Sequence, residues 1–183
     1  MDPELGFPPF DVTDNPSDGF INVFHPVTWI KNGVLQELSY DRFYAAACLG
    51  TGHGIGSTGA FRMDGIGEPT TVEEMIATTK RGLMVTCFSQ MSLEDSKSTL
   101  MRGYTRNGLW LIENGKISKS VKNMAITESI LFALNNIEQI GAPQRVFHPP
   151  KEVNWGAEDL PAPVVVPPLK IRDFSFTALI DAI

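Results

Sequence analysis

The most informative stretch of this sequence is Leu109-Trp-Leu-Ile-Glu-Asn-Gly-Lys-Ile117, in which Asn114-Gly115 separates two runs of strand-forming residues. An Asn-Gly pair between apolar runs is the strongest short signal for a β-hairpin, because both central residues of a type I′ turn need a positive φ. The same arrangement surrounds Asn32-Gly33, where Val27–Ile30 precedes and Val34–Leu38 follows. Residues 27–38 and 109–117 are therefore each predicted to form an antiparallel hairpin with its turn at Asn-Gly.

The cores of these two hairpins are similar to each other. Trp29-Ile-Lys-Asn-Gly-Val-Leu35 and Leu111-Ile-Glu-Asn-Gly-Lys-Ile117 align without a gap. Two origins stay open: an internal duplication, or two independent hairpins that use the same turn. Under either origin, the two Asn-Gly turns anchor the expected fold.

Two helices are also predicted. The first starts in Thr70-Thr-Val-Glu-Glu74, where a hydroxyl and a carboxylate three residues apart can form a capping box. It is expected to end near Lys80-Arg-Gly82, which suits a helix C-terminus. The second starts near Thr127 and stops at Gly141, before Pro143. Its apolar residues fall at helical spacing, and they are Ile130, Leu131, Leu134 and Ile137.

The remaining segments complete the expected α+β architecture. Residues 38–49 resemble a helix, residues 83–88 predict a buried strand, and residues 89–98 predict a polar loop. Prolines punctuate the chain after Pro143, which excludes helix and restricts strands to sheet edges. Residues 164–166 and 169–171 are short strand candidates within that tail.

These elements predict a mixed, strand-rich α+β domain, like a sheet or barrel, with two main helices and a proline-rich C-terminal segment. We expect residues 1–183 to form a single domain, in which residues 1–19 and 143–183 are largely irregular. The loop-rich start suggests that the chain is a fragment of a longer one.

Composition narrows the function classes. The net charge of −6 and the pI of about 5.0 argue against nucleic-acid binding, because no run of Lys or Arg supplies a local basic patch. No apolar stretch is long enough to span a bilayer and no signal peptide is evident, so the expectation is a cytoplasmic protein without a membrane partner. Cys48 and Cys87 are interpreted as small core residues, since no metal-ligand spacing surrounds them.

The order of these segments resembles the TldD/PmbA family, the "modulator of DNA gyrase" group of metallopeptidases. The shared pattern includes the I-x-N-G-x-L hairpin, a Thr/Gly-rich loop, R-M on a strand, the capped helix, L-I-E-N-G-K-I and a tail ending in P-x-L-K-I. Over residues 10–176 it is similar to the carboxy-terminal part of these proteins. The resemblance implies a peptide substrate, a homo- or heterodimer with a family member, and zinc in the intact enzyme.

The family's catalytic motif is absent from this sequence. In family peptidases an H-E-x-x-x-H helix binds zinc and activates water, whereas here no His-Glu pair occurs and the three histidines are His25, His53 and His148. Two explanations stay open: a zinc-dependent peptidase lacking this upstream segment, or a non-catalytic PmbA-like subunit that binds peptide and supports a catalytic partner. A free-standing binding domain is a third. We expect no catalytic residue, no bound cofactor and no activity in this chain alone.

The loop Gly50-Thr-Gly-His-Gly-Ile-Gly-Ser-Thr-Gly59 is the main candidate site. It contains G-x-G-x-x-G, but the strand before and the helix after that a dinucleotide site needs are not predicted. A flexible linker is one interpretation. The family resemblance implies instead a loop beside the substrate cleft, leading into a strand that can pair with an extended peptide. The candidate substrate-binding residues are His53, Gly54, Gly56, Ser57, Thr58, Gly59, Phe61, Arg62 and Met63.

Two histidines have alternative interpretations. His53 is either a solvated loop residue or a contact to substrate or metal. His148 precedes Pro149-Pro150, near where family peptidases place a third zinc ligand, a cysteine. Neutral imidazole binds zinc well, so His148 is a candidate ligand, with a surface position as the alternative.

Overall fold

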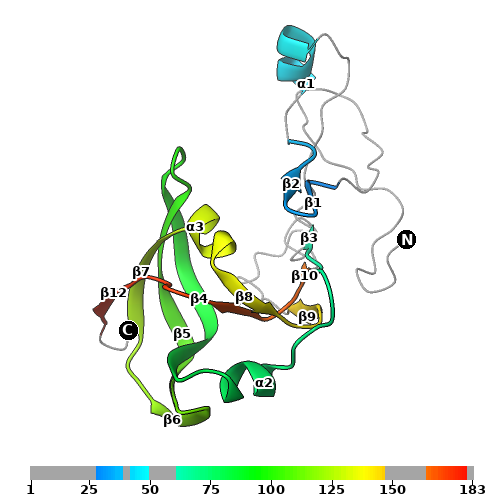
Figure 1. Cartoon of the computed structure of the whole chain (residues 1–183). Coiled ribbons are helices and arrows are strands. Elements are labelled where there is room, and N and C mark those ends of the chain that lie inside the picture. The colour runs from blue at the N-terminus through cyan, green and yellow to red at the C-terminus, as the bar shows by residue number, and fades with distance from the viewer. Residues whose placement is uncertain (1–27, 39–41, 50–60, 147–163, 181–183) are drawn as a thin grey trace, which may run out of the picture. The chain divides into compact units, whose positions relative to one another are not determined.

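The computed structural model describes residues 28–38, 42–49, 61–146 and 164–180 (Figure 1). The chain divides into two compact units, one formed by Met1–Ile66 with Pro143–Val166 and the other by Gly67–Ala142 with Pro167–Ile183. Each unit therefore combines segments that are far apart in the sequence. The single domain expected over residues 1–183 stays a prediction.

The first unit contains the predicted hairpin at Asn32-Gly33. Strands β1 (Ile30–Lys31) and β2 (Val34–Leu35) pair antiparallel. The φ angles of Asn32 and Gly33 are 52° and 76°, as a type I′ turn requires. The helix-like stretch that follows contains α1 (Arg42–Tyr44) and the π-helical turn η1 (Ala45–Leu49).

The second unit is built on one five-stranded sheet. Strand β5 (Leu100–Glu113) pairs along one edge with β4 (Arg81–Asp95), and β6 (Lys116–Ser120) and β7 (Met124–Ser129) share its other edge. Strand β12 (Phe176–Leu179) pairs with β7, so β4 and β12 lie at opposite ends of the order β12-β7-β5-β4. Strands β4 and β5 form a long twisted ribbon, coloured green in Figure 1.

The hairpin predicted over residues 109–117 is confirmed by β5 and β6. Its turn residues Asn114 and Gly115 have φ angles of 50° and 78°. The turn is held against the segment between α2 (Val72–Ala77) and β4, since the N–H groups of Asn114 and Gly115 donate to the carbonyl oxygens of Lys80 (2.8 Å) and Thr79 (2.9 Å).

The prediction of a polar loop over residues 89–98 is wrong for most of that range. Strand β4 continues to Asp95, and the turn covers only residues 96–99. Residues 89–95 form a strand despite their polar composition because they pair with β5. The pairing is irregular, since the register shifts between Ser89 and Ser92 and again between Leu93 and Asp95. Gln90 adopts a φ of 52° at the first of these bulges.

The first predicted helix is confirmed as α2 (Val72–Ala77). Its capping box is complete, because the Thr71 N–H donates to Oε2 of Glu74 (2.9 Å) and the Glu74 N–H donates to Oγ1 of Thr71 (3.2 Å). These bonds from Thr71 hold the pKa of the Glu74 carboxyl below its ordinary value. The helix ends at Ala77 rather than near Gly82, because β4 already begins at Arg81.

The second predicted helix is mostly wrong. Only α3 (Ile130–Asn135) is helical; Thr127 belongs to β7, and Ile137–Ile140 forms strand β8. Strand β8 pairs antiparallel with β11 (Leu169–Ile171), which confirms the strand predicted there. The apolar spacing that suggested one long helix is shared between a one-and-a-half-turn helix and a strand.

Among the residues that the structure describes, the core of the second unit is small. Its buried apolar side chains are Met75, Leu109, Ile112, Ile126 and Ala133. Neither cysteine belongs to it, contrary to expectation: Cys48 is exposed and Cys87 is only half-buried, because the segment 83–88 forms part of an edge strand.

The strand-rich α+β class is confirmed. The strands that the structure describes form several separate sheets and no closed barrel. Across residues 28–38, 42–49, 61–146 and 164–180, no helix has both the length and the apolar character that a membrane span requires.

Candidate functional site

The described part of the candidate peptide site lies on strand β3 (Phe61–Arg62). This strand pairs in parallel with β10 (Val164–Val166), whose other edge pairs antiparallel with β9 (Gln144–Val146). The Met63 N–H continues the ladder by donating to the carbonyl oxygen of Val165 (2.9 Å). Val165 is 1% exposed, so β10 forms the buried centre and β3 an edge of this three-stranded sheet.

Two side chains define the chemistry of this edge. The Phe61 ring is 44% exposed. The Arg62 guanidinium pairs with the Asp64 carboxylate, with Nε at 3.0 and 3.1 Å from the two oxygens. Because both groups are exposed, this ion pair contributes little to stability. It does orient the Arg62 side chain along its own strand.

The structure does not bring the other candidate residues together. His53, Gly54, Gly56, Ser57, Thr58 and Gly59 lie outside the described residues, as does His148. Their assignment to a peptide or metal site therefore stays a prediction.

The described residues form no cluster of zinc ligands. Within them, no three His, Cys, Asp or Glu side chains lie close enough to hold a metal ion. In the same ranges, every buried side-chain nitrogen or oxygen has a hydrogen-bond partner, so none is orphaned. This part of the chain does not fit a zinc site, and no step of hydrolysis is assigned to it.

A buried carboxylate, Glu128, is the polar feature that sequence reasoning missed. It is 6% exposed, and its two oxygens accept hydrogen bonds from the N–H groups of Ser129 and Ser175, both at 2.8 Å. Ser175 lies just before β12, so Glu128 links the end of β7 to a segment 47 residues away. Nothing in the local sequence signals this contact, because Ser175 is remote.

The neighbouring Ser129 fixes the start of α3. Its Oγ accepts the Phe132 N–H (3.4 Å) as the N-cap and donates to the Ser98 carbonyl oxygen (2.8 Å). Together, Glu128 and Ser129 hold β7, α3, the β4–β5 turn and the approach to β12 in one polar network. This network is structural, since each of its contacts is internal.

Replacing Glu128 with glutamine should lower the free energy of unfolding by about 2 kcal/mol, because the remaining amide oxygen accepts from only one of the two backbone N–H groups, without charge assistance, and the N–H₂ group faces the other donor. Urea unfolding followed by circular dichroism measures the loss. The matched control is Glu138→Gln on β8, where the side chain is exposed. Equal stabilities of the two variants would contradict the assigned role of Glu128.

The class of protein follows from comparing this fold with known families. The fold is a strand-rich α+β domain whose candidate site is a sheet edge. The family model for the "PmbA/TldA metallopeptidase C-terminal domain" matches residues 8–178. The chain therefore belongs to this family of metallopeptidase-related C-terminal domains.

A solved structure supports the fold. TldE from Thermococcus kodakarensis superposes with a TM-score of 0.54 at 16% sequence identity, over 82% of this chain and 33% of that chain. This chain thus spans about a third of the length of TldE. No curated protein matches it.

Proposed function

We propose that this chain is the carboxy-terminal domain of a zinc-dependent TldD/PmbA-type peptidase that processes peptides or proteins. The observation that carries the proposal is the family match over residues 8–178, because the family is described as a metallopeptidase domain. In this proposal the domain binds the peptide, whereas the zinc and the general base belong to an H-E-x-x-x-H segment elsewhere in the assembled enzyme.

The proposed peptide site comprises the glycine-rich loop and β3. An extended peptide would lie against the strand that starts at Phe61, where main-chain pairing tolerates many side-chain sequences. Support comes from the edge position of β3 and from the exposed Phe61 ring, which offers an apolar contact. Five glycines between Gly50 and Gly59 would permit close approach of the peptide backbone.

A second candidate function is a non-catalytic, PmbA-like subunit that binds peptide and supports a catalytic family member in a dimer. Like the first proposal, it is compatible with the absence of any His-Glu pair from the 183 residues. The two functions differ in where the zinc-binding motif resides: in the same polypeptide or in a partner. The upstream coding sequence and the metal content of the complete protein distinguish them.

The isolated chain should hold no stoichiometric zinc and hydrolyse no peptide. Hydrolysis requires an activated water and a general base, and this sequence lacks the family motif that supplies both. Elemental analysis after chelation and reconstitution with zinc measures the metal content, and a peptide-cleavage assay measures turnover. One tightly bound zinc per chain together with peptide turnover would overturn the assignment of catalysis to another segment.

Replacing both Gly56 and Gly59 with valine should weaken peptide binding about tenfold in the complete protein, because branched side chains keep the peptide backbone at a distance. Fluorescence anisotropy of a labelled peptide measures the affinity, and thermal unfolding verifies the fold. Thr177→Val, an exposed change on β12 in the other unit, is the control. Unchanged affinity in a normally folded double variant would show that the loop is only a connector.

A further inference from the structure

Asparagine followed by glycine occurs three times in the sequence, at Asn32, Asn107 and Asn114. This dipeptide is prone to spontaneous loss of the asparagine side-chain amide, because glycine has no side chain to shield its backbone nitrogen from reaction. The glycine nitrogen must reach Cγ of the asparagine, so a backbone that is held in one conformation protects the pair. The three pairs should therefore differ in reactivity if their backbones are held differently.

The reaction needs only water and a base. The glycine nitrogen loses its proton and bonds to Cγ of the asparagine, and ammonia leaves, which closes a cyclic succinimide. Water then opens the ring at either carbonyl. One product is aspartate, and the other is isoaspartate, in which the main chain runs through the former side chain. Water is consumed and ammonia is released, and nothing is oxidised or reduced.

Asn32 and Asn114 lie in two turns of the same local geometry. The φ angles are 52° and 76° at Asn32-Gly33 and 50° and 78° at Asn114-Gly115. Both asparagines are exposed to water. Any difference in reactivity between them in the folded chain must therefore come from the surroundings of the turns.

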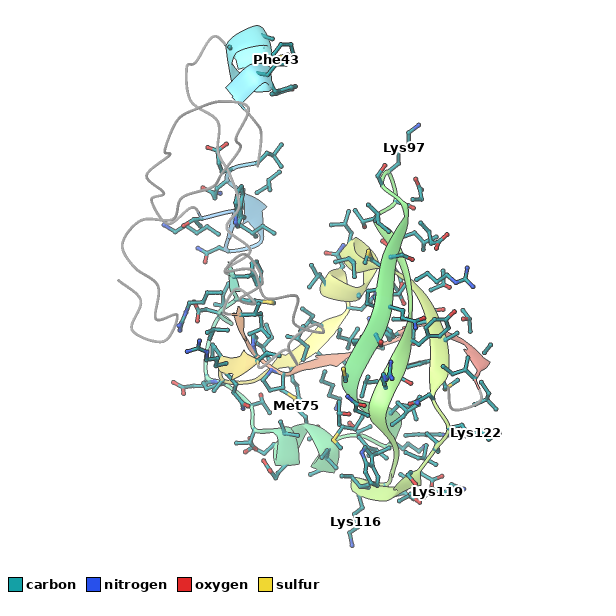
Figure 2. The ribbon with its side chains drawn as sticks, turned by 180° about the vertical axis from the view of Figure 1, so that it is seen from behind. Phe43, Met75, Lys97, Lys116, Lys119 and Lys122 are labelled. Atoms are coloured by element: carbon teal, nitrogen blue, oxygen red, sulfur yellow. The ribbon has the colours of Figure 1, made fainter. Side chains whose placement is uncertain are left out.

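The turn at Asn114 is held by the backbone around it. The Gly115 N–H, which would have to lose its proton, donates to the Thr79 carbonyl oxygen (2.9 Å), and the Asn114 N–H donates to that of Lys80 (2.8 Å). The turn also joins two strands of the five-stranded sheet. Lys116, the next residue, points outward from the end of the ribbon (Figure 2). Protection thus comes from backbone hydrogen bonds rather than from exclusion of water.

The turn at Asn32 has little such support among the described residues. Within them, the Gly33 N–H donates no hydrogen bond, and Gly33 is exposed whereas Gly115 is half-buried. Strands β1 and β2 contain only two residues each, and their side chains Ile30, Val34 and Leu35 are 59, 60 and 58% exposed. A two-stranded hairpin without packing is only marginally stable, so this turn should open at a low free-energy cost.

The third pair, Asn107-Gly108, is held within strand β5. Both flanking residues, Arg106 and Leu109, pair with β4. Gly108 is half-buried, and its carbonyl oxygen accepts a hydrogen bond from Oγ1 of Thr86 (2.9 Å). Release of this pair therefore requires the ladder between β4 and β5 to open.

We propose that Asn32 is a site of spontaneous deamidation and isomerisation in the folded chain, and that backbone contacts protect Asn107 and Asn114. Isoaspartate adds an atom to the main chain, so the two-residue turn can no longer keep Lys31 opposite Val34. Either product also adds a negative charge to the turn. The proposal does not depend on the proposed function, because Asn32 is not among the candidate peptide-binding residues.

The test is an incubation of the folded chain at mildly alkaline pH in water enriched in heavy oxygen. Each ring opening then leaves a label, and peptide mapping by mass spectrometry assigns it to one site. Asn32 should convert at least about tenfold faster than Asn107 and Asn114, because the rate follows the population of opened turns. Conversion of either other pair as fast as Asn32 would overturn the proposal.

The matched control is the same incubation in concentrated urea, where the three pairs should convert at similar rates because no fold protects them. If the preference for Asn32 persisted in the unfolded chain, the neighbouring side chains would set it, and the protection assigned to the backbone contacts would be wrong. Amide hydrogen exchange gives an independent measurement in the folded chain. The Gly33 N–H should exchange at least about tenfold faster than the Gly115 N–H. Equal exchange at the two glycines would contradict the proposal.

Discussion

Replacing Leu109 with alanine should lower the free energy of unfolding by about 3 kcal/mol, because it leaves a cavity in a core that cannot easily close. Leu109 is 1% exposed, and it lies on β5, which pairs with three other strands. Only five apolar side chains are buried in this unit within the described residues, so each supplies a large share of its hydrophobic stabilisation. Urea unfolding monitored by tryptophan fluorescence measures the change.

The control for this substitution is Leu93→Ala on the same ribbon. Leu93 is 56% exposed, so removal of its side chain should change the free energy of unfolding by no more than about 0.5 kcal/mol. If Leu93→Ala lowered the free energy of unfolding as much as Leu109→Ala, the side chains buried along β5 would not be the main hydrophobic core of this unit.

Substitution of Gly115 by alanine should cost about 3 kcal/mol, because two penalties combine. Its φ of +78° is unfavourable for a residue with a side chain. An added Cβ would also lie 2.6 Å from the Ala77 carbonyl oxygen, a backbone atom at the end of α2, so the hairpin and the helix would have to separate. Thermal and urea unfolding of the two proteins measure the loss.

Gly67→Ala separates these two penalties. Gly67 has a φ of +92°, but a Cβ added there would meet nothing within 4 Å, so only the conformational cost of about 1 kcal/mol applies. If Gly67→Ala and Gly115→Ala lowered the free energy of unfolding equally, the turn would accommodate a Cβ at residue 115 by a small displacement from α2.

Local sequence signals predicted the elements whose geometry is decided locally. Both Asn-Gly turns have the expected positive φ angles, and the Thr71–Glu74 capping box forms as its spacing suggests. In each case, the residues that determine the conformation are only a few positions apart. That is why a single sequence is sufficient to predict them.

The incorrect predictions concern elements that remote pairing decides. Residues 89–95 are polar enough for a loop, yet they form a strand because β5 lies beside them. Ile137–Ile140 continues a helical spacing, yet it pairs with β11, which lies much later in the chain. Glu128 is buried for the same reason, since its partner Ser175 is distant in sequence. Of the candidate site, only Phe61, Arg62 and Met63 fall in the described residues, and the strand expected there is confirmed.

The division of the chain into two discontinuous units has a consequence for its synthesis on the ribosome. The antiparallel pairs among β4, β5, β6 and β7 join neighbouring segments, so they can form as soon as residue 129 has left the exit tunnel. The ladders β8–β11 and β7–β12 must wait for residues 169–179, and the sheet of β3, β10 and β9 for residues 164–166. Both units are therefore completed almost together, once residues 164–179 have emerged, and until then the nascent chain presents unpaired strands that chaperones can bind.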